Sequence, residues 1–160
     1  MYKGDKSKFG KEQLVKMEER KSRPNIKTPD EINDDLTPMR AEAGAILYNT
    51  YCGSCHMANG KGDGSRFPPI AGSDWVKGDQ KRLIDVVLSG LNGPIEVNGN
   101  PFDGMMPPVD YLEDEQIAQI LTYVRKEFGE NSPPVGSYYV KVGRYYAKKT
   151  KQKKEEEEEK

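Results

Sequence analysis

The sequence is poor in the residues that most often bind metals or form covalent links. Its 160 residues include two cysteines and one histidine. A structural zinc site commonly takes four Cys or His ligands, which is more than the chain contains. With a single histidine, a metal held by two imidazoles of this chain is excluded as well. The three residues, Cys52, Cys55 and His56, fall within five consecutive positions, so they are expected to serve one site.

The sequence also lacks the features of membrane-spanning, secreted-precursor and nucleic-acid-binding chains. Its longest apolar run is a few residues, far short of the roughly 20 that cross a bilayer, so no membrane span is predicted. Residues 1–10 contain lysines with no apolar segment behind them, so no signal peptide is predicted within the sequence. The basic residues form no stripe interleaved with aromatic residues, so nucleic acid is not an expected partner.

Apolar residues are concentrated in the middle of the chain. Hydrophobic residues make up 34% of the sequence and charged residues 32%, and the mean hydropathy is -0.87. Such a polar chain cannot be packed uniformly around one core. Tyr, Ile, Leu and Val gather between about residues 41 and 128, where acidic residues outnumber basic ones, whereas both ends are mildly basic. The sequence therefore predicts one compact acidic domain with polar arms.

Four segments follow from this distribution. Residues 1–37 are predicted to form a polar N-terminal leader or strap, and residues 38–131 the domain. Residues 132–147 form a Tyr/Pro-rich extension that can lie on the domain or on a partner. Residues 148–160 form a low-complexity Lys/Glu tail, expected to be a solvated disordered segment or a helix held only by i,i+4 ion pairs.

The spacing of apolar residues predicts three helices within the domain. The first opens at Thr37 or Pro38 and runs to Tyr51, the second covers about residues 79–91, and the third about residues 112–129. The first helix is expected to turn Ala43, Ile46, Leu47 and Thr50 inward. The third carries a strong apolar stripe of Ile117, Ile120, Leu121, Val124 and Phe128.

Long loops are predicted between these helices. Residues 58–74 and 92–111 are rich in glycine and proline, which disfavour regular structure there. Structureless loops of this length in a compact domain usually surround a functional site. Three short helices also supply few apolar residues for a core. We therefore expect a large apolar cofactor to provide the missing core mass.

The segment Cys-Gly-Ser-Cys-His, from Cys52 to His56, is the attachment signature of a c-type haem. Two thiols add across the two vinyl groups on one edge of the porphyrin, and the histidine then lies beneath the iron. Two alternatives are weaker. A thioredoxin-like dithiol requires a βαβ setting, whereas this motif is predicted at the end of a helix. A zinc site lacks the further ligands it needs.

A second iron ligand is sought by elimination. Without another histidine, the alternatives are methionine, lysine, tyrosine, water or an open position. Met57 adjoins His56 and cannot reach the opposite face, and Met1, Met17 and Met39 lie in the leader or near the first helix. Met105 and Met106 lie in a predicted loop directly before two prolines, whose fixed backbone dihedral helps to hold a side chain in place. One of these two methionines is the predicted ligand.

At this point the chain resembles the class I c-type cytochromes, over about residues 38–131. The motifs are, in order, AGAILYNTYCGSCH, FPPIAGSDWV, GMMPP and DEQIAQILTYVRKEFG. The resemblance implies an all-α fold, with three to five short helices wrapped around one covalent haem and extended arms at both ends. It implies that Met106, directly before proline, is the ligand, and that the Pro68 carbonyl accepts a hydrogen bond from His56. It also implies that Tyr123 packs where the terminal helices cross near Gly44.

The resemblance further implies an electron-transfer protein and not an enzyme. Its cofactor is one heme c attached through Cys52 and Cys55, with iron bound by His56 and Met106. Trp75 and Tyr111 are expected to pack near the haem or bond to a propionate. An alternative is a gas sensor or a peroxidase-like enzyme with a displaceable methionine.

The segment RLIDVVLSGLNGPIEVNGNPFDGMMPP is more narrowly similar to bacterial haem domains or subunits of dehydrogenases. The expected partners are redox proteins that meet the haem edge, namely a dehydrogenase, a quinol-oxidising complex or a terminal oxidase. Covalent attachment of haem normally occurs outside the cytoplasm, so a periplasmic or other extracytoplasmic location is expected. The tyrosines of residues 138–146 are expected either to tether a partner or to cover the domain surface.

Overall fold

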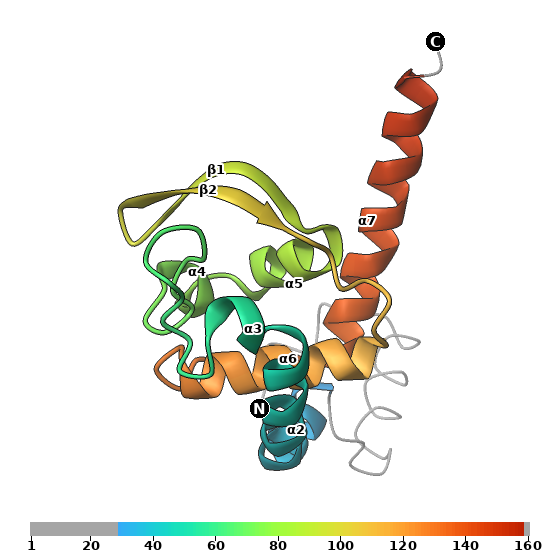
Figure 1. Cartoon of the computed structure of the whole chain (residues 1–160). Helices are drawn as coiled ribbons and strands as arrows, with labels where there is room; N and C mark the ends of the chain where they lie inside the picture. The colour runs from blue at the N-terminus through green and yellow to red at the C-terminus, as the bar shows by residue number, and fades with distance from the viewer. Residues whose placement is uncertain (1–28, 159–160) are drawn as a thin grey trace, which may run out of the picture.

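The computed structural model describes residues 29–158, so most of the predicted leader lies outside the described residues. The elements, labelled as in Figure 1, are α2 (Pro29–Tyr51), α3 (Gly53–His56), α4 (Asp74–Lys77), α5 (Gln80–Ser89), β1 (Leu91–Val97), β2 (Asn100–Met106), α6 (Asp114–Glu127) and α7 (Ser137–Glu158). Helices dominate this part of the chain, as predicted, and one antiparallel hairpin lies between α5 and α6 (Figure 1).

The helices α2 and α6 cross in very close contact at Gly44. A Cβ atom added to Gly44 would lie 2.0 Å from the backbone oxygen of Gln119 and 2.8 Å from the Cβ of Tyr123. Directly beside this crossing, the fully buried ring of Tyr48 packs on Tyr123 and Phe128, with ring centroids 5.5 Å and 5.4 Å away. The expected position of Tyr123 at the crossing is confirmed. This crossing fixes the end of α2, from which the cysteine and histidine motif continues.

Two predictions for α2 are wrong. The helix begins at Pro29 rather than at Thr37 or Pro38. Proline suits the first position of a helix, because it lacks an N–H group that would have no helical partner there. The inward face differs in part: Leu47 packs against the core as predicted, but Ile46 is 71% exposed, while Ala41 and Tyr48 are buried. The face of α2 that contacts α6 is the one that carries Gly44. Glycine has no apolar side chain, so the spacing of apolar residues does not reveal this face.

The predictions for α5 and α6 are confirmed. Asp79 caps α5 by accepting a hydrogen bond from the backbone N–H of Lys81, and Gly90 ends the helix. In α6, Glu113 and Gln116 form a reciprocal capping box, and the predicted apolar stripe is buried. These two helices supply most of the apolar core.

A β-hairpin lies where a loop was predicted for residues 92–111. Strands β1 and β2 pair from Leu91 opposite Met106 to Val97 opposite Asn100. The two turn residues, Asn98 and Gly99, have φ values of 51° and 75°, the left-handed conformation that two-residue hairpin turns favour. The hairpin lies on the opposite side of the molecule from α2 (Figure 1).

The C-terminal extension packs against the domain before it leaves it. Val135 and Val140 are fully buried, and the hydroxyl of Thr122 lies 3.2 Å from both the backbone nitrogen and the carbonyl oxygen of Val135. The buried guanidinium of Arg125 donates to the carbonyls of Val76, Gly78 and Pro133, which ties α4 and the extension to α6. The first part of the extension therefore lies on the domain rather than on a partner.

The helix α7 docks on α5 and α6 by its first two turns and then projects from the molecule (Figure 1). Arg144 donates to the carboxylate of Asp114 at 2.8 Å and to the carbonyl of Leu112 at 2.6 Å. Beyond these contacts the helix continues to Glu158, with an i,i+4 pair of 3.8 Å between Lys153 and Glu157. Of the two forms expected for the tail, the structure has the helical one. Among the described residues, no helix is long and apolar enough to cross a membrane.

Candidate functional site

Cys52, Cys55 and His56 lie on one tight helical turn directly after α2. The backbone N–H of Cys52 still donates to Tyr48, and the N–H of His56 donates to the carbonyl of Cys52 at 2.9 Å. Cys55 and His56 line one cavity, and Cys52 and His56 line a second, adjoining one. Neither cysteine forms a disulfide. The helical turn thus brings both thiols and the imidazole to one crevice, as the motif predicts.

The crevice is large and almost entirely apolar. Its two parts span about 500 Å³ and 680 Å³, solvent at their open mouths included, and share His56, Pro68, Leu91, Ile95 and Met106 as walls. The deeper part is also lined by apolar residues of α5 and α6, namely Leu83, Val86, Val87, Ile120, Leu121 and Val124. Cavities of a few hundred to a thousand Å³ with apolar walls are typical cofactor sites. The crevice therefore fits a large flat apolar group that is joined to two thiols at one edge.

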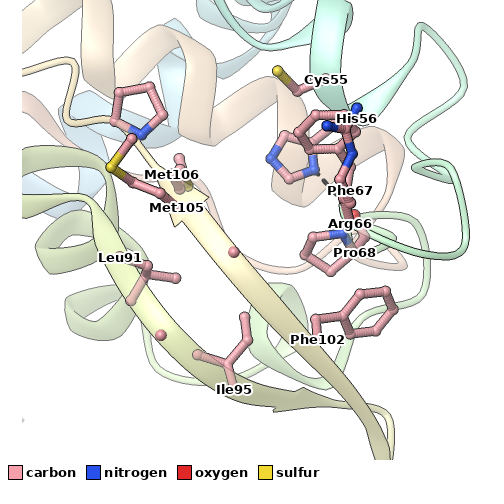
Figure 2. Close-up of a pocket in the computed structure, with 13 residues that line it drawn as sticks. Cys55, His56, Arg66, Phe67, Pro68, Leu91, Ile95, Phe102, Met105 and Met106 are labelled. Carbon is pink, nitrogen blue, oxygen red and sulfur yellow. Dashed lines mark hydrogen bonds between the residues drawn. The ribbon is translucent and has the colours of Figure 1, made fainter.

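The imidazole of His56 is held in one orientation. Its Nδ1 lies 3.0 Å from the carbonyl oxygen of Pro68, on the same side of the crevice (Figure 2). Because a carbonyl can only accept, Nδ1 must carry the proton. Burial lowers the pKa of His56, although the bond to Pro68 acts in the opposite direction. The neutral ring then has an unprotonated Nε2, which is the form that binds a metal. The hydrogen bond expected from the resemblance is present.

The thiol of Cys52 lacks the lowered pKa of a redox-active cysteine. Burial, and then the neighbouring Cys55, raise the pKa of Cys52 to about 11. Redox-active cysteines have lowered pKa values, which favour the nucleophilic thiolate. Residues before the motif form a helix and no βαβ unit surrounds it among the described residues. Both observations disfavour the thioredoxin-like alternative.

The hairpin forms the wall of the crevice opposite His56. Figure 2 shows Met106 and Leu91 across the crevice from His56 and Pro68, with Ile95 further along the same strand as Leu91. Met106 ends β2, is half-buried and lines both parts of the crevice. Met105 is 73% exposed and lines only the outer part. The alternation of a strand explains this difference, because neighbouring residues point to opposite faces.

Trp75 lines the deeper part of the crevice, whereas Tyr111 does not line either part. The indole N–H of Trp75 donates to the backbone carbonyl of Glu96 in the hairpin at 2.8 Å, and the guanidinium of Arg82 lies 3.4 Å from its ring centroid. Tyr111 is 68% exposed and packs edge-on against Tyr51. Trp75 therefore contributes a packed ring to the wall, and its N–H is used by the hairpin.

The loop that presents Pro68 is ordered by Asp63. Its carboxylate accepts hydrogen bonds from the backbone N–H groups of Ser65, Arg66 and Phe67, at 2.8 to 2.9 Å. These bonds, with the one from Phe67 strongest, lower the pKa of Asp63. A Cβ atom on Gly62, whose φ is 64°, would lie 2.1 Å from the carbonyl oxygen of Phe67. Glycine and a short carboxylate thus fold the loop back on itself and bring Pro68 to His56.

Sequence reasoning found the thiols, His56, Pro68, the Met105 and Met106 pair and Trp75, but it missed the hairpin wall. Leu91, Ile95, Val97 and Phe102 face the crevice from the two strands. In β1 the more buried residues alternate with exposed ones, ending at a buried Val97. An Asn-Gly pair between two short apolar stretches is a hairpin pattern, and it was available in the sequence.

Comparisons with known proteins agree with this geometry. Residues 41–127 match the protein-family model described as Cytochrome c. The chain is 38% identical over 91 residues to cytochrome c-552 of Thermus thermophilus, across 54% of this chain and 69% of that protein. It is 35% identical over 96 residues to the cytochrome c subunit of the quinone alcohol dehydrogenase of Gluconobacter oxydans, of which it spans 20%. It is 29% identical over 99 residues to the cbb3-type cytochrome c oxidase subunit CcoP of Rhodobacter capsulatus, of which it spans 33%.

Proposed function

The chain belongs to the cytochrome c family, and on that premise we propose that it shuttles single electrons through a haem iron bound by His56 and Met106. The family implies one haem c attached through Cys52 and Cys55, and the crevice fits that group. The observation that carries the ligand assignment is the pair of facing walls, with an oriented imidazole on one and Met106 on the other. The bound haem supplies a one-electron redox couple.

Each residue of the site has a distinct part in this function. Pro68 fixes the orientation of His56 and makes its Nε2 a better electron donor. A thioether from Met106 favours the reduced iron relative to a second imidazole, which raises the reduction potential. The apolar walls exclude water and strengthen both effects. Trp75 completes the wall beside the hairpin.

A carrier explains the crevice better than an enzyme does. A peroxidase-like site needs an open side with a general acid or base next to the iron. Apart from His56, Arg66 is the one charged residue among the described residues that line either part of the crevice. A guanidinium cannot exchange protons near neutral pH. If His56 and Met106 both hold the iron, no site would be left on it for a substrate.

The proposed partners are redox proteins that meet the haem edge where the crevice opens. The similar proteins include a subunit of an alcohol dehydrogenase and a subunit of an oxidase, which supports an exchange of electrons with such enzymes. As a free carrier, the protein needs only a small transient interface for this transfer, whereas a bound subunit would meet its partner in a larger permanent one. We place this activity in the periplasm or another extracytoplasmic space, where covalent haem attachment normally occurs.

Visible spectra of two alanine variants test the ligand assignment. Met106→Ala is expected to abolish the weak red absorption band of the iron–sulfur bond, convert the iron from low to high spin and lower the reduction potential. Met105→Ala is the matched control, because that side chain is mainly exposed and should leave the spectrum unchanged. If Met105→Ala removes the band and Met106→Ala keeps it, the assignment is wrong. A wild-type protein without the band would contradict methionine ligation altogether.

A further inference from the structure

The hairpin that carries Met106 has little structure of its own to hold it in place. A two-stranded hairpin is marginally stable by itself in water. Its inward residues pack on the crevice, while its outward face is exposed, including Asn92, Pro94, Glu96 and Asp103. The position of Met106 must therefore depend on what fastens the hairpin to the domain.

The base of the hairpin is held next to Met106. Gly90, with a φ of 70°, leads from α5 into β1, and a Cβ atom there would lie 2.4 Å from the carbonyl oxygen of Met106. Just after β2, the backbone N–H of Val109 donates to the carbonyl of Val87 in α5 at 2.9 Å. These contacts fix only one end of the hairpin. By themselves they would not keep its tip against the crevice.

A reciprocal pair of hydrogen bonds holds the tip. The backbone N–H of Asp74 donates to the side-chain oxygen of Asn98 at 2.9 Å, and the backbone N–H of Asn98 donates to the carboxylate of Asp74 at 2.9 Å. The amide of Asn98 also reaches the carbonyl of Gly72 at 3.4 Å, and Trp75 donates to Glu96 at 2.8 Å. We name the Asp74–Asn98 pair, with these two accessory bonds, the tip latch.

The tip latch joins the two walls of the crevice. Asp74 opens α4 at the end of the segment that begins with Pro68, so it belongs to the wall of His56. Asn98 lies in the turn of the hairpin, which is the wall of Met106. Within residues 29–158, the four bonds of the latch are the only hydrogen bonds that join the hairpin to the remainder of the protein. The latch thus closes the crevice at the end away from the base.

We propose that Asp74 and Asn98 are positioning residues for Met106, which act by keeping the hairpin closed over the cofactor. This inference rests on the proposed function, since it takes Met106 as the ligand. When the latch is intact, the hairpin is clamped at both ends and the thioether stays in the crevice. When the latch is broken, only the base remains fastened, so fraying of β2 from its tip reaches its last residue, Met106, more often. The latch therefore sets how readily an external ligand can replace the methionine.

Free imidazole is a suitable probe of this opening. It can bind the ferric iron only when Met106 has moved away, so its apparent dissociation constant varies inversely with the open fraction. Asp74→Ala removes the carboxylate that accepts from the N–H of Asn98. Asn98→Gly removes the amide that accepts from the N–H of Asp74 and reaches the carbonyl of Gly72. Each variant loses one bond of the reciprocal pair, so we expect each to bind imidazole about fivefold more tightly than the wild type, the factor that one hydrogen bond of ordinary strength contributes. Glycine tolerates the positive φ at position 98, so that variant removes the side chain without straining the turn.

The imidazole affinity of three reference variants, each with haem bound, is measured in the same experiment. Asp74→Asn keeps an oxygen that can accept from the N–H of Asn98, so it should restore nearly wild-type affinity for imidazole. Thr122→Val removes a buried hydrogen-bonding pair between α6 and the extension, away from the hairpin. It should lower the melting temperature at least as much as Asp74→Ala while leaving imidazole affinity unchanged. Met106→Ala should bind imidazole most tightly of all.

The outcomes separate the latch from the ligand assignment. Tighter binding by both latch variants, with Asp74→Asn and Thr122→Val close to the wild type, supports the inference. Unchanged binding by both latch variants, while Met106→Ala binds tightly, overturns the latch and leaves the ligand in place. An equal gain in imidazole affinity by Thr122→Val also overturns the latch inference, because the gain would then come from a general loss of stability. If Met106→Ala does not tighten binding, the Met106 assignment itself fails, and the latch inference fails with it.

Discussion

A chain in which Cys52 and Cys55 are both replaced by alanine is expected to lose its cooperative fold once dissociable haem is extracted. Without thioether bonds the cofactor is held only by its ligands and by packing, so it can be removed. The apolar side chains that α5, α6 and the hairpin contribute to the crevice walls then have no partner atoms. The packing and the hydrophobic burial that the cofactor supplies are both lost, in a fold whose whole stability is expected to be about 5–15 kcal/mol.

Far-ultraviolet circular dichroism during heating measures this effect. The extracted double variant should show reduced helix content and no sharp transition, whereas Ser54→Ala, between the two cysteines and exposed, should behave like the wild type. A double variant that melts cooperatively near the wild-type temperature after extraction would show that the crevice closes without the cofactor. The role of the haem as core would then be wrong.

Gly44→Ala is expected to destabilise the protein by about 3 kcal/mol or more, at the upper end of overpacking effects. The added methyl group would lie 2.0 Å from the backbone oxygen of Gln119, and a backbone atom cannot rotate away as a side chain can. The helices α2 and α6 must then move apart, which disturbs Tyr48, Tyr123 and Phe128 at the same crossing.

Denaturant unfolding of the haem-bound protein gives the size of the change. Ile46→Ala, on the same helix but 71% exposed, is the control and should stay within about 0.5 kcal/mol of the wild type. A Gly44→Ala protein as stable as that control would contradict the close crossing of α2 and α6. The position of the cysteine and histidine turn depends on this crossing, so a shift in the haem spectrum should accompany the loss of stability.

Local sequence signals predicted the chemistry of the site and two of its supporting helices. The three residues Cys52, Cys55 and His56 are informative because their spacing is imposed by the porphyrin and not by the rest of the fold. The apolar period of α6 and the cap at Asp79 are likewise local, since each depends on residues within a few positions. These features need no knowledge of what packs against them.

Features that depend on distant partners were missed or misread. The inward face of α2 is decided by Gly44, whose importance appears only when Gln119 lies against it. The glycines and prolines of residues 92–111 predict a loop, but the Asn98–Gly99 turn between alternating residues forms a hairpin instead. The bonds of Arg125 to three carbonyls and of Asp74 to Asn98 join residues that are far apart in the sequence. No periodicity marks such pairs.

Mass spectrometry of the intact chain under denaturing conditions, after expression in a host that attaches haem, decides whether the cofactor is covalently bound. We expect a single species heavier than the polypeptide by one haem, which keeps its Soret absorption after unfolding and solvent extraction. A species with the mass of the polypeptide alone and no Soret absorption would contradict the covalent cofactor, and with it the ligand assignment and the closed crevice.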